Sequence, residues 1–182
     1  MKCAMAVLSL KTKVLLSIAL AIGPGASLAA GALEFAPPAC DFAISFPIAP
    51  AVESLPNVAP GHVVTKAQTP GDYLPWLVAQ CTESAAGSDS ITADVRESKD
   101  RAMLQRMHAQ NIVSSSKHDP RGEWTTTVGD VVIDGKAMVF TKLYIVGPHS
   151  ALFVTALEPA KGDESTKGRF FASIARRPAR SD

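Results

Sequence analysis

The sequence predicts an α+β fold, in which an antiparallel sheet of about five to seven strands is flanked by one long helix and one short C-terminal helix. The first observation is the stretch 129–158, where two turn signals separate three apolar runs. Asp134-Gly135 favours a two-residue hairpin, because a type I′ turn needs positive φ at both central positions. Gly147-Pro148-His149-Ser150 favours a second reversal. The stretch therefore predicts a β-meander around which the other elements are arranged.

The second observation is a charged segment, residues 91–110, that predicts the long helix. Ser88 or Ser90 can cap its start, and apolar residues recur along it at helical spacing. The apolar stripe is narrow, and charged residues occupy the rest of the surface, which predicts a solvated outer face. The positions expected to face the sheet are Ile91, Val95, Ala102, Met103, Met107 and Gln110.

The remaining elements follow from alternation and turn residues along the chain. Apolar residues occupy every second position of 42–46, which predicts a half-buried strand that ends at Pro47. The proline-containing segment 47–61 predicts an irregular crossing or a frayed edge hairpin. The other predicted elements are strands at 62–69 and 73–82, a polar strand or loop at 112–118, a strand at 124–133 and a short helix at 169–174.

The first thirty residues have the three parts of a secretory signal peptide. Three lysines and no acid precede the apolar run 14–22, and glycine, proline and small residues follow it. A membrane anchor is the alternative, but this run is half the length of the about 20 apolar residues that span a bilayer. We expect cleavage after Ala29 or Ala30, no membrane span in the mature form, and a periplasmic or, alternatively, extracellular location. The mature chain then divides into a flexible lead-in (31–39), one domain (40–175) and a flexible tail (176–182).

Charge and cysteine content narrow the function classes. Removing residues 1–30 takes three lysines from 18 basic residues and none of the 17 acidic residues, so the mature chain is slightly acidic. Nucleic acid is therefore not expected as a partner. Cys40 and Cys81 remain, and an even pair in an oxidising compartment favours a disulfide, worth about 4 kcal/mol by loop-closure entropy. A reactive or metal-binding pair is the alternative.

The sequence contains no recognisable catalytic or cofactor-binding motif. No histidine pair has the spacing of a helical metal site, and no serine lies in a nucleophile motif. We therefore expect no enzyme, no metal and no cofactor. Aromatic residues and one histidine are the candidates for a partner or ligand surface: Trp76, Trp124, Tyr144 and His149.

Five features follow one another in a recognisable order: Phe42-Ala43-Ile44-Ser45-Phe46-Pro47, the helix 91–110, Asp134-Gly135, the strand 143–147 and Arg169–Ile174. Their order resembles the PsbP-type α/β sandwich. The likeness covers most of residues 40–175. It implies a non-catalytic scaffold that docks on a partner, and it transfers no binding residue to this chain.

The sequence therefore favours an exported, non-enzymatic binding or accessory module that docks on an unknown envelope protein. The alternative is a small-molecule or metal-binding protein with a pocket between the helix 91–110 and the sheet.

Overall fold

A computed structural model of the chain describes residues 33–55, 63–71, 73–83, 92–162 and 164–178. The expected signal peptide and Ile91 lie outside these residues. In the described part, no helix is both long enough and apolar enough to cross a membrane.

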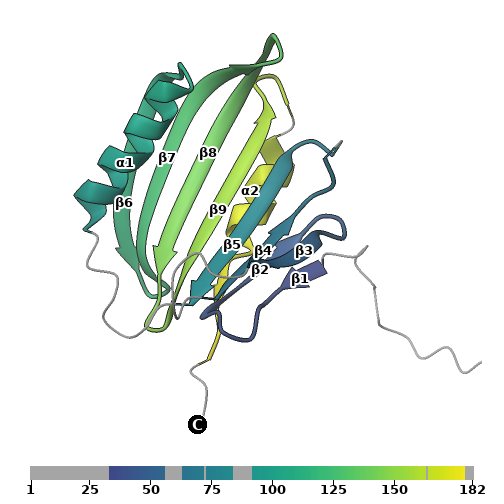
Figure 1. The fold of residues 1–182 in the computed structure, drawn as a ribbon, viewed down its shortest axis with the longest axis vertical. Helices are drawn as coiled ribbons and strands as arrows, with labels where there is room; N and C mark the ends of the chain where they lie inside the picture. Colours follow the sequence, from purple (N-terminus) through teal and green to yellow (C-terminus); the bar gives the residue numbers. More distant parts are fainter. Residues whose placement is uncertain (1–32, 56–62, 72, 84–91, 163, 179–182) are drawn as a thin grey trace, which may run out of the picture.

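The described residues form two antiparallel sheets and two helices (Figure 1). The larger sheet has the order β3 (Ala51–Leu55), β4 (Val64–Gln68), β5 (Trp76–Glu83), β9 (Ser150–Pro159), β8 (Lys136–Val146), β7 (Gly122–Ile133) and β6 (Gln110–Asp119). The smaller sheet has the order β1 (Leu33–Phe35), β2 (Phe42–Phe46) and β10 (Ala175–Arg176), and the helices are α1 (Ala93–Arg106) and α2 (Glu164–Ala172). The predicted α+β fold with one long and one short helix is confirmed.

The predicted meander is formed by β7, β8 and β9. Asp134 and Gly135 have φ of 49° and 74°, so both positions of the first turn are in the left-handed region that the Asp-Gly signal predicts. At the second turn, the backbone N–H of Gly147 donates to the carbonyl of Ser150 over 2.8 Å. The two turns place β8 between β7 and β9, where it forms hydrogen bonds on both edges.

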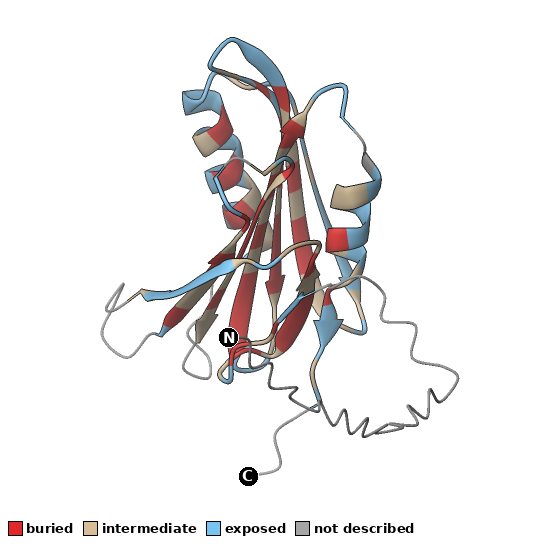
Figure 2. Ribbon diagram, turned by 90° about the vertical axis from the view of Figure 1, so that its right-hand side faces the viewer, coloured by how far each residue is buried: buried red, intermediate tan, exposed pale blue. Residues whose placement is uncertain are grey.

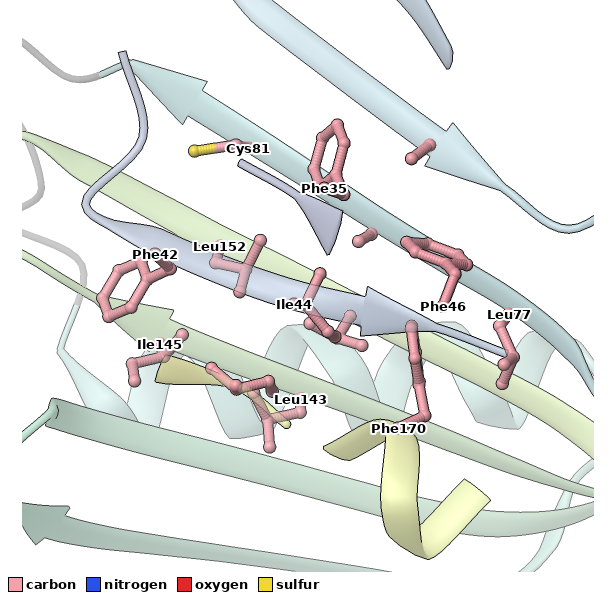
Figure 3. Close-up of a cluster of buried hydrophobic side chains, with 14 of the residues drawn as sticks. Phe35, Phe42, Ile44, Phe46, Leu77, Cys81, Leu143, Ile145, Leu152 and Phe170 are labelled. Carbon is pink, nitrogen blue, oxygen red and sulfur yellow. The ribbon is translucent and has the colours of Figure 1, made fainter. Parts of the chain in front are cut away.

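The helices lie on opposite faces of the larger sheet (Figure 2). The face opposite α1 carries the main core, in which aliphatic residues of the large sheet pack against β2 and α2 (Figure 3). Phe46 and Phe170 are at its centre, with ring centroids 4.9 Å apart. Burial of large apolar side chains in this layer is the main stabilising contribution to the fold.

Parts of both expected flexible segments take part in the small sheet. In the lead-in, β1 pairs with β2, and Phe35 is buried. In the tail, Arg176 belongs to β10, and the next residue is tied to the same strand end: the backbone N–H of Arg177 donates to the Asp41 carbonyl over 2.7 Å. These positions form strands because β2 offers hydrogen-bonding partners on both edges. Residues 179–182 lie outside the described residues.

The Cys40–Cys81 disulfide is present and joins the two sheets. Cys40 precedes β2 and Cys81 lies in β5, with their Cα atoms 6.0 Å apart and both residues buried. The two strands belong to stacked layers rather than to neighbouring positions in one sheet. The bond therefore fixes the small sheet on the large one.

We expect the double variant C40A/C81A to lose about 4 kcal/mol of unfolding free energy, because the 41-residue loop is no longer closed in the unfolded chain. Urea denaturation of the oxidised protein and the variant measures this difference. Reduction of the wild-type protein should give a loss of similar size. Unchanged stability in both experiments would contradict a structural role for the bond.

Candidate functional site: a charged cleft between α1 and the sheet

Helix α1 faces the sheet with charged residues at its N-terminal half. Arg96, Asp100 and Leu104 are its buried residues, with Arg96 8% and Asp100 6% exposed. The sequence-based orientation is therefore wrong: Val95 and Met107 are 44% and 38% exposed. Ala102 is exposed as well, and Gln110 is an exposed residue at the start of β6, whereas Met103 is half-buried as expected.

Apolar packing at the C-terminal half of α1 fixes this orientation. Leu104 is fully buried in a second, small core with Val131, Met138 and Phe140. The helix approaches the sheet closely there, since a Cβ at Gly129 would lie 3.1 Å from Leu104 Cδ1. With Leu104 turned inward, residues four and eight positions earlier lie on the same face. Those residues are Asp100 and Arg96.

Arg96 is held against β7 and β8 by three contacts. Its guanidinium forms an ion pair with Glu123 and donates from Nε to Thr125 Oγ1 over 3.4 Å. Its Cζ atom lies 4.9 Å from the ring centroid of Tyr144, a cation–π distance. The buried charge therefore has an acid, a hydroxyl and an aromatic ring as partners.

Asp100 is compensated from the sheet by Lys142. The two side chains form an ion pair, and the Lys142 ammonium lies 5.9 Å from the ring centroid of Phe153. Tyr144 and Phe153 are cross-strand partners whose ring centroids are 4.4 Å apart. Two ion pairs and two aromatic rings thus occupy the space between α1 and β7, β8 and β9.

This arrangement leaves a cavity of about 220 Å³, which we call the α1 cleft. Its lining residues are Arg96, Lys99, Asp100, Lys142, Tyr144 and Phe153. Three cations, one carboxylate and two rings suit a small anionic or amphipathic group. Within the described ranges, no group of three His, Cys, Asp or Glu residues is arranged to hold a metal ion.

The four surface candidates do not form one site. Tyr144 lines the α1 cleft, and Trp76 is half-buried on β5 outside its lining. Trp124 is 3% exposed and belongs to the main core on the opposite face. His149 is exposed in the β8–β9 turn, where its backbone N–H donates to Asp41 Oδ2 over 2.7 Å.

The sequence-based search missed five of the six cleft residues: Arg96, Lys99, Asp100, Lys142 and Phe153. A signal was present in β8, where Lys142 interrupts the apolar face between Phe140 and Tyr144. A lysine at such a position needs an acid on the element that covers it. Asp100 is that acid.

A second polar cluster surrounds Trp124 at the β6–β7 turn. Asp119 Oδ1 accepts the indole N–H of Trp124 over 2.9 Å, and Oδ2 accepts Nη2 of Arg121 over 2.7 Å. The hydrogen bonds from the Arg121 side chain hold the pKa of Asp119 well below its ordinary value of 3.8, and the Trp124 N–H acts in the same direction. Asp119 is therefore a fixed negative charge that orders the turn.

A larger cavity, about 370 Å³, lies between β2 and α2. Phe46 and Phe170 of the main core line it, together with hydroxyl side chains. Arg169 is its charged lining residue, and it is exposed and donates to Thr166 over 3.4 Å. The α1 cleft is the better candidate because its lining charges include two buried ones.

Comparison with known proteins identifies the fold. No family model matches the sequence, and no curated protein matches it. The chain is similar to the solution structure of cyanobacterial PsbP (CyanoP) from Synechocystis sp. PCC 6803, with a TM-score of 0.55 and 10% identity over 86% of this chain and 99% of that one. A second similar structure, from Bacteroides thetaiotaomicron VPI-5482, has a TM-score of 0.46 and 12% identity over 79% of this chain. The chain spans about half of that structure, 48%. The expected PsbP-like resemblance is thus confirmed at the level of fold.

We expect K142M to destabilise the protein by about 3 kcal/mol, because it leaves the Asp100 carboxylate buried without its ion-pair partner. The double variant D100L/K142M should recover stability to within about 1 kcal/mol of the wild type, since two apolar side chains fill the same space. Urea denaturation of the three proteins measures the difference. Equal stability of K142M and the double variant would show that the pair is not coupled.

The lowered pKa of Asp119 makes its contribution to stability depend on pH. The contribution is present above 3.8, the ordinary pKa that we assign to the unfolded chain, and is lost as the pH falls from there through the lowered pKa of the folded state. We expect D119N to be less stable than the wild type at pH 7, with a difference that shrinks below pH 3.8. Thermal unfolding over this pH range tests the expectation, and a constant difference at every pH would refute it.

Proposed function

We propose that the protein is an exported, non-enzymatic binding module that docks on another envelope protein through the α1 cleft. The observation that carries this proposal is the pair of buried charges, Arg96 and Asp100, that a helix places against the sheet around a cavity. Buried ion pairs are often no more stabilising than apolar residues of the same volume. Their presence here in place of an apolar contact supports a role in recognition.

The rim of the cleft supports docking by a protein. Val95 and Lys99 lie one turn apart on α1, and both are exposed. Protein interfaces commonly have a polar rim around a less polar centre, so an apolar side chain beside a cation is a combination that they use. The cavity volume of about 220 Å³ is below the 300 to 1,000 Å³ typical of pockets for drug-sized ligands, so it suits one inserted side chain.

Two features support export to the periplasm. Residues 1–30 have the composition of a signal peptide. The disulfide between Cys40 and Cys81 agrees with an oxidising compartment, because such bonds are rare where glutathione keeps thiols reduced.

A second candidate function is the binding of a small molecule in the same cavity. The observation that favours it is the close pair of Tyr144 and Phe153, whose rings are inclined by 56° and form an apolar wall beside the Lys142 ammonium. A small planar molecule that carries a negative charge matches this wall. Non-denaturing mass spectrometry of protein isolated from the periplasm distinguishes the two candidates, because a bound small molecule adds a discrete mass.

Site-specific photocrosslinking in living cells tests the docking proposal. A photoreactive amino acid at position 99, on the cleft rim, should crosslink one dominant envelope protein. The same amino acid at position 136, an exposed lysine next to the β7–β8 turn, is the matched control and should not. Introducing D100L/K142M into the position-99 protein should abolish the crosslink, since it removes two of the charges that line the cleft, those of Asp100 and Lys142.

Equal crosslinks from positions 99 and 136 would show that capture is unspecific. A crosslink from position 99 that survives D100L/K142M would place the contact outside the cleft. Either result would overturn the assignment of the docking site.

A further inference from the structure

The β6–β7 turn gathers three cations at one end of the sheet. The Lys117 ammonium and the Arg121 guanidinium lie 5.1 Å and 4.1 Å from the ring centroid of Trp124. Arg176, which arrives from β10, donates from Nη1 to the carbonyl of Pro120 over 3.4 Å. We call Lys117, Arg121 and Arg176 the basic turn.

Asp119 compensates Arg121 within the basic turn, and the other nearby acid, Glu123, is paired elsewhere. Asp119 accepts from Arg121 and from the Trp124 indole, and Arg121 also reaches the Ile174 carbonyl. Glu123 pairs with Arg96 on the opposite face of the sheet. Across the described ranges, Lys117 and Arg176 have no carboxylate within ion-pair distance.

Both uncompensated cations are exposed, and their surroundings are ordered. Lys117 extends from a paired strand, and Arg176 belongs to a strand paired with β2. Arg121 is fixed by its contacts with Asp119. A preorganised set of cations loses less side-chain entropy when it binds an anion.

We propose that the basic turn binds an acidic segment of a partner protein. The surface is compact, since its three cations surround a single turn, and this size fits a short run of carboxylates. Trp124 is buried rather than exposed, so the surface lacks the aromatic anchor that interfacial membrane binding uses. The inference goes beyond the α1 cleft, because Trp124 and the cleft lie on opposite faces of the sheet, and either surface can act without the other.

A binding experiment with a defined acidic probe tests the inference. Fluorescence anisotropy of a labelled hexaglutamate peptide is measured against the wild-type protein at low ionic strength. Loss of two exposed charge contacts in K117Q/R176Q should weaken binding about tenfold, and added salt should weaken the wild-type complex.

The matched control is K136Q/K161Q, which removes the same charge from two exposed lysines outside the basic turn. Its affinity for the peptide should equal that of the wild type. Equal losses in both variants would show a general charge effect and overturn the inference. Absence of peptide binding would overturn it as well.

The second part of the test measures binding to phosphatidylglycerol vesicles, with phosphatidylcholine vesicles as the reference. Binding to the anionic vesicles that K117Q/R176Q abolishes, without peptide binding, would assign the surface to lipid and refute the proposal. The α1 cleft is untouched by these substitutions, so crosslinking from position 99 reports on the docking site independently.

Discussion

Strand β8 is covered on both faces, and the alternation of its side chains gives the molecule two different interiors. Leu143 and Ile145 point into the main core with β2 and α2. Lys142 and Tyr144 point to the α1 side and line the cleft. A shift of one residue in the register of β8 would exchange the two sets and place an ammonium in the apolar core. The pairing of β8 with β7 and β9 is therefore the constraint on which both the core and the cleft depend.

The two interiors differ in how much they contribute to stability. The main core is apolar, is closed by a disulfide, and supplies most of the burial that holds the fold. The α1 side is anchored by one small apolar cluster around Leu104, which leaves the helix N-terminal half free to carry charges. A protein in this arrangement can retain costly buried ion pairs, because its stability is secured on the other face of the sheet. This division is a reason why we propose the α1 cleft as the site for a partner.

Sequence reasoning succeeded where local chemistry decides the structure. The Asp134-Gly135 turn, the meander and the existence of both helices follow from turn residues and periodicity. The disulfide partners follow from the cysteine count. The sequence does not predict the layer to which Cys40 belongs, because the packing of β2 across the large sheet is set by long-range contacts.

The predicted orientation of α1 was wrong for a physical reason that can be traced to particular residues. Apolar periodicity assigned Val95 and Met107 to the interior, although their burial depends on where Leu104 finds its pocket. Once Leu104 packs next to Gly129, the helix must turn Arg96 inward. Charges at helical spacing are usually read as a solvated face, and only the lysine within β8 indicated otherwise.

Nuclear Overhauser contacts between α1 and β8 in the purified protein test the central claim most directly. The structure predicts contacts from the side chain of Arg96 to the ring of Tyr144 and from Asp100 to Lys142. Contacts from Val95 to the Tyr144 ring instead would show that the helix is rotated about its axis relative to this structure. In that orientation an apolar contact would take the place of the charged cleft, which would contradict the account.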